Sequence, residues 1–148
     1  MIRANVALLL HPSLRGRAFI QNMFRRDLLP FEILLMDNGL GDLSIPTKIK
    51  SNHFYYLYEE PALTLRKNKF NFSFVPSLDC NNEKVVESVK NLKSDWVIYT
   101  GGGILRKRIL ATGKNFIHVH PGKLPEYRGS TCFYYSLIKD GKCCFIAF

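Results

Sequence analysis

The stretch DWVIYTGGGILRKRILATGKNFIHVHPG, residues 95–122, decides the fold. It reads as a buried strand that opens into three glycines, a short helix that ends near Gly113, and a second strand, NFIHVH, that runs into Pro121 and Gly122. A strand, a helix and a strand in this order predict two parallel strands joined by a crossover. Both strands end in loops at the edge of the sheet where α/β proteins bind ligands, so the same stretch locates a candidate site.

The rest of the chain repeats this alternation. Three further strands are predicted in NVALLL, FEILLMDN and FSFVPSL, and a helix that Pro30 ends is predicted in RGRAFIQNMFRRDLL. The clearest helix lies in NNEKVVESVKNLKS, with Asn81 or Asn82 as its cap. A helix that stops at Gly141 and a last strand are predicted in STCFYYSLIKD and KCCFIAF, whereas HFYYLYEEPALTLRKN fits a strand or a short helix.

This pattern predicts an α/β fold: a Rossmann-like, mostly parallel sheet with helices on both faces, incomplete at the C-terminus. The 148 residues, of which 47% are hydrophobic and 22% charged, suit a single domain over residues 1–148. No apolar run approaches the length of a membrane span. The run from Val6 to Leu10 is too short for a signal peptide, so a buried strand in a cytoplasmic protein is expected.

Charge favours anionic partners. The chain has 21 Lys and Arg against 12 Asp and Glu, a formal net charge of +9. Such an excess attracts phosphates, nucleotides, carboxylates or nucleic acid. The basic residues form no long block, so a solvated basic surface explains them as well as a nucleic-acid-binding function does.

The four cysteines have no metal-binding spacing. Cys80, Cys132, Cys143 and Cys144 contain no CxxC pair. Adjacent residues of a strand point to opposite faces, so Cys143 and Cys144 are expected to form neither a mutual disulfide nor a shared metal site. Buried, reduced thiols are the expectation.

His118 and His120 stand one residue apart in a predicted strand and therefore face the same side. Two imidazoles can act as base, proton shuttle or hydrogen-bond donor. Zinc is disfavoured because no third ligand is evident nearby, and His11 and His53 are distant in sequence. Two exposed histidines at a strand edge are the simpler explanation of the pair alone. The stiff, proline-containing loop that follows favours a fixed site instead.

The glycine run YTGGGIL has neither the GxGxxG spacing of a dinucleotide site nor the Gly-Lys-Ser/Thr of a phosphate loop. Its three glycines can expose backbone groups to a ligand that approaches closely. A flexible turn between strand and helix explains them equally well.

The segment FIHVHPGKLPEYRG, residues 116–129, resembles the signature segment of the formyl-tetrahydrofolate-dependent formyltransferases. This family includes the methionyl-tRNA, glycinamide-ribonucleotide and amino-sugar formyltransferases. Its usual segment reads roughly Asn-x-His-Pro-Ser-Leu-Leu-Pro with a Tyr-Arg-Gly-like ending, and the matching residues here are His118 to Pro125 and Tyr127 to Gly129. The preceding DWVIYTGGGIL is similar to the strand and loop that line the family's folate pocket. The resemblance is good from about Asp95 to Phe148 and weak before it.

The resemblance implies transfer of a formyl group from the co-substrate formyl-tetrahydrofolate to a primary amine. It assigns the catalytic imidazole to His120, and it places His118 where the family has an Asn that donates a hydrogen bond to the oxyanion. The implied folate-binding residues are Gly101, Gly102, Gly103, Ile104, Leu105 and Leu124. The implied substrate-binding residues are Ser13, Arg15, Gly16 and Arg128; a simple basic turn explains the first three as well.

One family residue is not matched. The catalytic Asp of the family follows the His by some tens of residues, past Phe148, and Asp140 is expected in the wrong element, a turn between helix and strand. The chain alone is therefore expected to bind its ligands but to transfer poorly. No metal and no membrane partner are expected, and a homodimer is compatible with the sequence.

The acceptor expected from the charge and from the lack of a tRNA-binding domain is a small anionic amine, with an amino-sugar nucleotide favoured and tRNA or a ribonucleotide left open. The alternative is a catalytically inactive family member that binds folate, a nucleotide or a partner protein. A third interpretation, a basic nucleic-acid-binding domain, has no motif to support it, and nucleic acid is not expected as a partner without a further domain.

Overall fold

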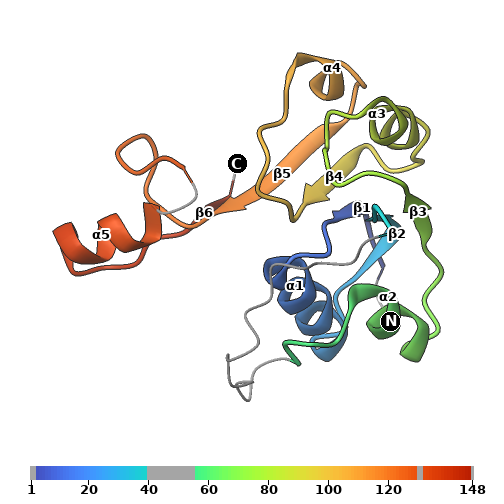
Figure 1. The fold of residues 1–148 in the computed structure, drawn as a ribbon, viewed down its shortest axis with the longest axis horizontal. Helices are drawn as coiled ribbons and strands as arrows, with labels where there is room; N and C mark the ends of the chain where they lie inside the picture. The colour runs from blue at the N-terminus through green and yellow to red at the C-terminus, as the bar shows by residue number, and fades with distance from the viewer. Residues whose placement is uncertain (1–2, 40–55, 130–131, 148) are drawn as a thin grey trace.

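The computed structural model describes residues 3–39, 56–129 and 132–147. Helices and strands alternate along this part of the chain, as the sequence predicts (Figure 1). In chain order they are β1 (Arg3–Leu10), α1 (Leu14–Arg25), β2 (Leu29–Met36), α2 (Pro61–Lys67), β3 (Ser73–Val75), α3 (Glu83–Lys90), β4 (Trp96–Tyr99), α4 (Lys107–Leu110), β5 (Asn115–His120), α5 (Cys132–Asp140) and β6 (Ile146–Ala147).

The strands form one mostly parallel sheet in the order β3-β2-β1-β4-β5-β6. Strands β1 to β5 pair in parallel, and β6 pairs antiparallel to β5. The chain proceeds from β1 to β2 and β3 on one side, then crosses back to place β4 and β5 on the other side of β1. Open α/β sheets bind ligands outside the carboxyl ends of the strands at such a switch point, which here lies between β1 and β4.

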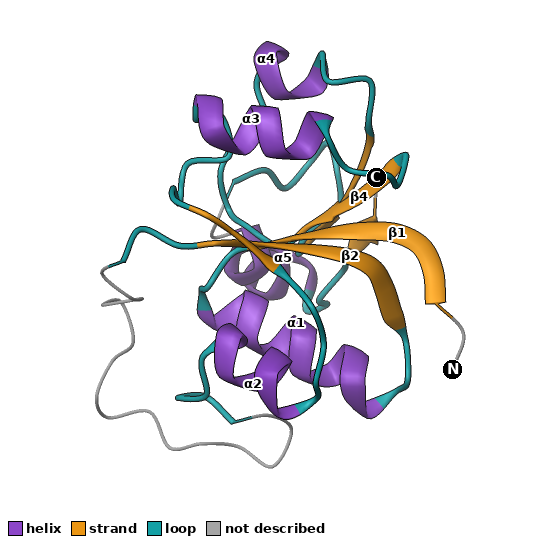
Figure 2. Cartoon of the chain, turned by 90° about the vertical axis from the view of Figure 1, so that its right-hand side faces the viewer, coloured by secondary structure: helices purple, strands orange, loops and turns teal. Residues whose placement is uncertain are grey.

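Two apolar layers cover the two faces of the sheet. Leu8 of β1 belongs to a buried cluster with Ile20 of α1, whereas the next residue, Leu9, faces the other way and joins Val89 of α3 and Ile109 of α4. Figure 2 shows α1 and α2 below the sheet and α3 and α4 above it. The predicted α/β sheet with helices on both faces is confirmed.

The end of the first helix differs from the prediction. Helix α1 ends at Arg25, and Asp27 has a φ of 54°, in the left-handed region. Pro30 does not end the helix but is the second residue of β2, where it is buried. A proline is tolerated there because β3 pairs only with the far end of β2, from Leu34 to Met36, so the missing N–H costs no ladder bond on that side.

Helix α4 is shorter than predicted. The helix was predicted in ILRKRILAT, residues 104–112, but it begins at Lys107 and ends at Leu110. The side chain of Asn81 donates through Nδ2 to the carbonyl oxygen of Ile104 at 2.9 Å and accepts through Oδ1 from the backbone N–H of Arg106 at 2.8 Å. These two bonds hold the backbone before α4 in an extended conformation. The dihedral angles of Arg106, φ −94° and ψ 171°, show this conformation.

The segment after α5 corrects the cysteine prediction. Strand β6 covers only two residues, so Cys143 and Cys144 precede it and do not alternate within a strand. All four cysteines are free, and Cys80 and Cys132 are buried as expected. Cys143 is exposed and Cys144 half-buried.

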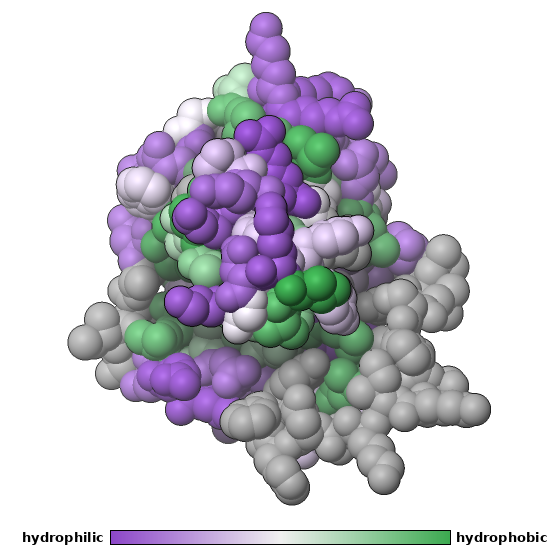
Figure 3. Space-filling view, turned by 90° about the vertical axis from the view of Figure 1, so that its left-hand side faces the viewer, coloured by the Kyte–Doolittle hydropathy of each residue, from purple (hydrophilic) through white to green (hydrophobic). Residues whose placement is uncertain are grey.

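Helix α5 extends away from the body of the molecule (Figure 1). Its buried residues are Cys132 and Ser136. Figure 3 shows the face of the molecule on this side, where separate apolar groups lie among hydrophilic side chains. Neither α5 nor any other helix within the described ranges is long and apolar enough to cross a membrane.

A candidate active site at the carboxyl edge of the sheet

The loops that follow β1 and β4 are tied together at the switch point. The backbone N–H of His11 donates to Oγ1 of Thr100 at 2.9 Å. Nη1 of Arg15 donates to the carbonyl oxygen of Gly101 at 3.4 Å. The first turn of α1 is therefore fixed beside the glycine loop, and it brings a guanidinium group to the edge of the site.

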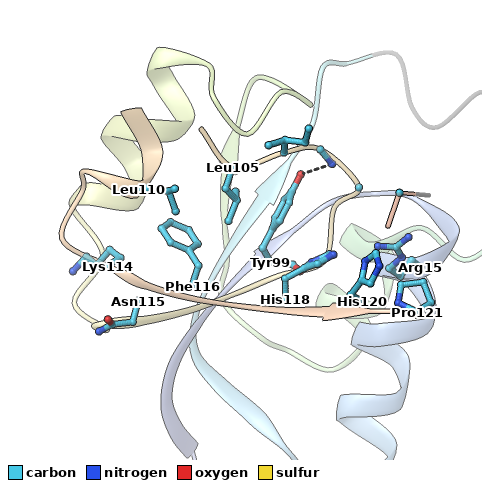
Figure 4. Close-up of a pocket in the computed structure, with 14 residues that line it drawn as sticks. Arg15, Tyr99, Leu105, Leu110, Lys114, Asn115, Phe116, His118, His120 and Pro121 are labelled. Carbon is cyan, nitrogen blue, oxygen red and sulfur yellow. Dashed lines mark hydrogen bonds between the residues drawn. The ribbon is translucent and has the colours of Figure 1, made fainter. Parts of the chain in front are cut away.

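His118 and His120 project from β5 into one pocket, as their spacing predicts (Figure 4). Nδ1 of His118 lies 2.9 Å from the carbonyl oxygen of Tyr99, on the neighbouring strand. Nε2 of His120 lies 3.0 Å from the carbonyl oxygen of Tyr127, in the loop that follows β5. Each ring is half-buried and is oriented by a backbone carbonyl.

The loop after β5 is held by further side chains. Sγ of Cys132 lies 3.4 Å from Nε2 of His120 and donates to the carbonyl oxygen of Pro121 at 2.7 Å. The hydroxyl of Tyr127 donates to Oδ2 of Asp140 at 2.7 Å, which raises the pKa of Tyr127 to about 12. Both ends of α5 therefore support this loop, and Asp140, the last residue of the helix, supports it through its carboxylate.

Tyr99, the last residue of β4, holds the glycine loop. Its buried hydroxyl accepts a hydrogen bond from the backbone N–H of Gly103 at 3.2 Å. Burial and a hydrogen bond with Cys80 raise the pKa of Tyr99, and burial raises the pKa of the Cys80 thiol, so both groups are neutral near pH 7. A Cβ at Gly101 would lie 2.2 Å from the Tyr99 hydroxyl, so the loop can fold over the ring only with glycine at this position.

These loops enclose a pocket of about 590 Å³, within the range of about 300–1,000 Å³ that is typical of small-molecule sites. Figure 4 shows a basic end, an apolar and aromatic middle, and a polar far end. In that order the main side chains are Arg15, His120 and His118, then Tyr99, Leu105, Phe116 and Leu110, then Lys114 and Asn115. This arrangement suits a ligand with a flat apolar body and anionic groups, and it places two imidazoles beside one end of that ligand.

The structure brings most of the predicted folate-loop residues and both histidines together. The predicted site residues that line the pocket are His118, His120, Gly102, Gly103, Ile104, Leu105 and Arg15. Ile104 is 79% exposed, so its side chain is available to a ligand. No Asp or Glu is among the lining residues of the described chain, and its histidines, cysteines and carboxylates form no cluster of three that could hold a metal ion.

Other predicted site residues lie outside the described pocket wall: Gly101, Leu124, Ser13, Gly16 and Arg128. Ser13 caps α1 by accepting a hydrogen bond from the backbone N–H of Gly16 at 3.4 Å. Gly16 is buried where α1 contacts the carbonyl oxygen of His11. Nε of Arg128 donates to the carbonyl oxygen of Pro125 at 3.0 Å. The structure thus gives Ser13, Gly16 and Arg128 roles in the local backbone.

The sequence analysis missed several lining residues: Tyr99, Leu110, Lys114, Asn115, Phe116, Pro121 and Gly129. Phe116 stands two residues before His118 in the same strand. The alternation that predicts a common face for His118 and His120 therefore also places Phe116 on that face. Asn82 caps α3, whereas Asn81, the other candidate cap, holds the backbone at the end of the glycine loop, a role that the sequence does not indicate.

Comparisons with known proteins point to one group of enzymes. No family model matches the chain. A methionyl-tRNA formyltransferase of Finegoldia magna is 29% identical over 87 residues, which make up 57% of this chain and 28% of that relative. The chain thus matches little more than a quarter of the length of this curated relative.

Solved structures share the fold over nearly the whole chain. A phosphoribosylglycinamide formyltransferase from Anaplasma phagocytophilum has a TM-score of 0.58 at 15% identity, over 99% of this chain and 65% of that one. A sugar N-formyltransferase from Shewanella has a TM-score of 0.50 at 15% identity, over 97% of this chain and 50% of that one. At these identities the likeness concerns the fold.

The fold and the pocket define an α/β domain of the doubly wound class with its ligand site at the switch point. More narrowly, the chain has the fold of the formyl-tetrahydrofolate-dependent formyltransferases and carries a segment similar in sequence to one of them. The resemblance that the residues around His120 indicate is thereby confirmed.

Proposed function

We propose that residues 1–148 form a single formyltransferase domain that passes a formyl group from formyl-tetrahydrofolate to a primary amine of an anionic acceptor. The observation that carries this proposal is the placement of His118 and His120 at the basic end of a pocket that the glycine loop also lines. The absence of a membrane-spanning helix among the described residues is compatible with action in the cytoplasm.

The pocket residues fit a folate. The ring of Tyr99 and the side chains of Leu105 and Phe116 offer apolar surface to a flat heterocycle, and the exposed backbone of Gly102 and Gly103 offers hydrogen-bonding groups to its edge. When bound, formyl-tetrahydrofolate supplies the formyl group. His120 would stabilise the negative oxygen that develops during transfer or handle the amine proton.

The acceptor that we favour is an amino-sugar nucleotide. The net charge of +9 and the guanidinium group of Arg15 at the reacting end of the pocket suit a phosphate-bearing amine. The similar structures include a sugar N-formyltransferase and phosphoribosylglycinamide formyltransferases, so a ribonucleotide and tRNA stay in the test as acceptors.

The test is a transfer assay with the purified full chain, formyl-tetrahydrofolate and a panel of amines. The panel contains an amino-sugar nucleotide, the same amino sugar without its nucleotide, phosphoribosylglycinamide and methionyl-tRNA. We expect release of tetrahydrofolate that depends on the amine, together with a formylated product that mass spectrometry detects, and a preference for the sugar nucleotide over the uncharged sugar. Release of tetrahydrofolate without formation of a formylated amine would contradict the proposal.

A second candidate is a protein that binds folate or a nucleotide without catalysis. It is favoured by one observation: the described lining of the pocket contains no carboxylate, and the carboxylate of Asp140 is engaged with the hydroxyl of Tyr127. Saturable binding of the folate with no turnover for any amine would support this candidate over the first.

A further inference from the structure

We propose that Asn81 is a positioning residue of the pocket, which holds the glycine loop in the conformation that receives the folate. The proposal rests on the proposed function and adds one residue to that site. Asn81 lies just before α3 and is not among the residues of the described chain that line the pocket, so it acts on a ligand only through the loop.

The glycine loop needs anchors from elsewhere in the chain. Gly102, Gly103 and Ile104 are exposed, and glycine has more conformational freedom to lose than any other residue. If the loop became ordered only on binding, the lost entropy would weaken the affinity for the ligand. Side chains that order the loop beforehand therefore strengthen binding, even where they do not contact the ligand.

The carboxamide of Asn81 is such an anchor. Its Nδ2 donates to the carbonyl oxygen of Ile104 at 2.9 Å, and its Oδ1 accepts from the backbone N–H of Arg106 at 2.8 Å. The carbonyl oxygen can only accept and the backbone N–H can only donate, so the position needs a donor and an acceptor on one short side chain. Asparagine provides both, aspartate provides only the acceptor, and alanine provides neither.

Asn81 is itself held in place by the two residues before it. Oδ1 of Asp79 accepts from the backbone N–H of Asn81 at 2.9 Å and from its Nδ2 at 3.3 Å. Sγ of Cys80, a buried residue, donates to the same carbonyl oxygen of Ile104 at 3.7 Å. The carboxamide is thus oriented before any ligand binds, as a positioning group must be.

These bonds determine what Ile104 can offer to a ligand. Its carbonyl oxygen is engaged with Asn81 and Cys80, whereas its side chain is exposed and lines the pocket. With the backbone fixed, this side chain stays in the pocket wall beside Leu105. The loop therefore presents apolar surface to a flat ligand, and it has less conformational freedom left to lose on binding.

The anchoring can be measured without a ligand. In the Asn81→Ala variant the backbone N–H of Arg106 loses its acceptor, so it should exchange with deuterium about fivefold faster. The control is Asn82→Ala, which removes the cap of α3. There the backbone N–H of Lys84, which donates to Oδ1 of Asn82 at 3.0 Å, should exchange faster instead. Unchanged exchange at Arg106 in Asn81→Ala, or equal acceleration there in both variants, would overturn the proposal.

The affinity test uses Asn81→Asp and Asn82→Asp, which add the same negative charge at adjacent positions. Aspartate caps a helix about as well as asparagine does, so Asn82→Asp should keep α3 intact. The carboxylate in Asn81→Asp can still accept from Arg106, but it cannot donate to Ile104. In calorimetry with tetrahydrofolate, the dissociation constant of Asn81→Asp should exceed that of Asn82→Asp by about tenfold.

The positioning role and the proposed function fail in different ways. Equal affinities of the two aspartate variants, with measurable binding by the wild type, would overturn the positioning role alone. A wild type that binds no tetrahydrofolate would refute the proposed function, and with it the effect of Asn81 on folate affinity. The melting temperatures of both variants should stay near that of the wild type, which shows that a loss of affinity does not come from unfolding.

Discussion

Replacing His120 with alanine is expected to lower kcat for formyl transfer by about 10²–10⁴-fold, because under the proposed function the variant loses the imidazole that stabilises the reacting centre. His120 is held by the carbonyl oxygen of Tyr127 and by Cys132, so it is positioned before any ligand binds. Single-turnover and steady-state measurements of formylated product give kcat, and the melting temperature of the variant shows whether it still folds.

The matched control is Val119→Ala. Val119 lies between the two histidines in β5, is 39% exposed and alternates to the other face of the strand. Its truncation removes apolar surface from the same strand but no pocket residue, so kcat should stay close to that of the wild type. Full turnover by His120→Ala would show that the role assigned to His120 is wrong.

The second large effect concerns the backbone and not the chemistry. Gly16→Ala is expected to lower the free energy of unfolding by about 3 kcal/mol, the upper part of the usual range for overpacking. A Cβ at this position would lie 1.8 Å from the carbonyl oxygen of His11, a backbone atom that cannot move without displacing α1 from β1. For a chain of this size the melting temperature should fall by about 6–12 °C.

Gly102→Ala is the control for this substitution. No atom lies within 4 Å of the Cβ that it would add, so its unfolding free energy should remain near that of the wild type. Urea denaturation of the two variants gives the comparison directly. Equal stability of both variants would mean that Gly16 is not required for the close approach of α1 to the loop after β1.

The class of fold could be read from the sequence because buried parallel strands and amphipathic helices leave distinct periods. The strand around Val97, the helix around Val85 and the strand with His118 were all predicted at nearly their observed positions. The boundaries that failed depend on tertiary partners. Pro30 is tolerated as the second residue of β2 because strand β3 pairs only with the far end of β2. Helix α4 begins only at Lys107 because the side chain of Asn81 holds the backbone before it extended.

Part of the candidate site could also be predicted, because the period of a strand shows which of its side chains share a face. A period of two on β5 predicts that His118 and His120 share a face, and the position of the glycine loop after β4 places it beside them. The hydrogen bonds that Tyr99 and Tyr127 make with the rings could not be predicted, because they join residues through backbone carbonyls that carry no side-chain signal. That His118 donates a hydrogen bond where the family has an asparagine stays a prediction.

The most direct test of the central claim is the affinity of the pocket for a folate. Calorimetry with tetrahydrofolate should show one-to-one binding to the wild-type chain. Two substitutions of exposed isoleucines form a matched pair: Ile104, 79% exposed, lines the pocket, whereas Ile138, 82% exposed, lies on α5. Ile104→Asp should weaken binding by at least about tenfold, a loss of about 1.4 kcal/mol, and Ile138→Asp should leave it unchanged. No binding to the wild type, or equal losses in the two variants, would contradict the account.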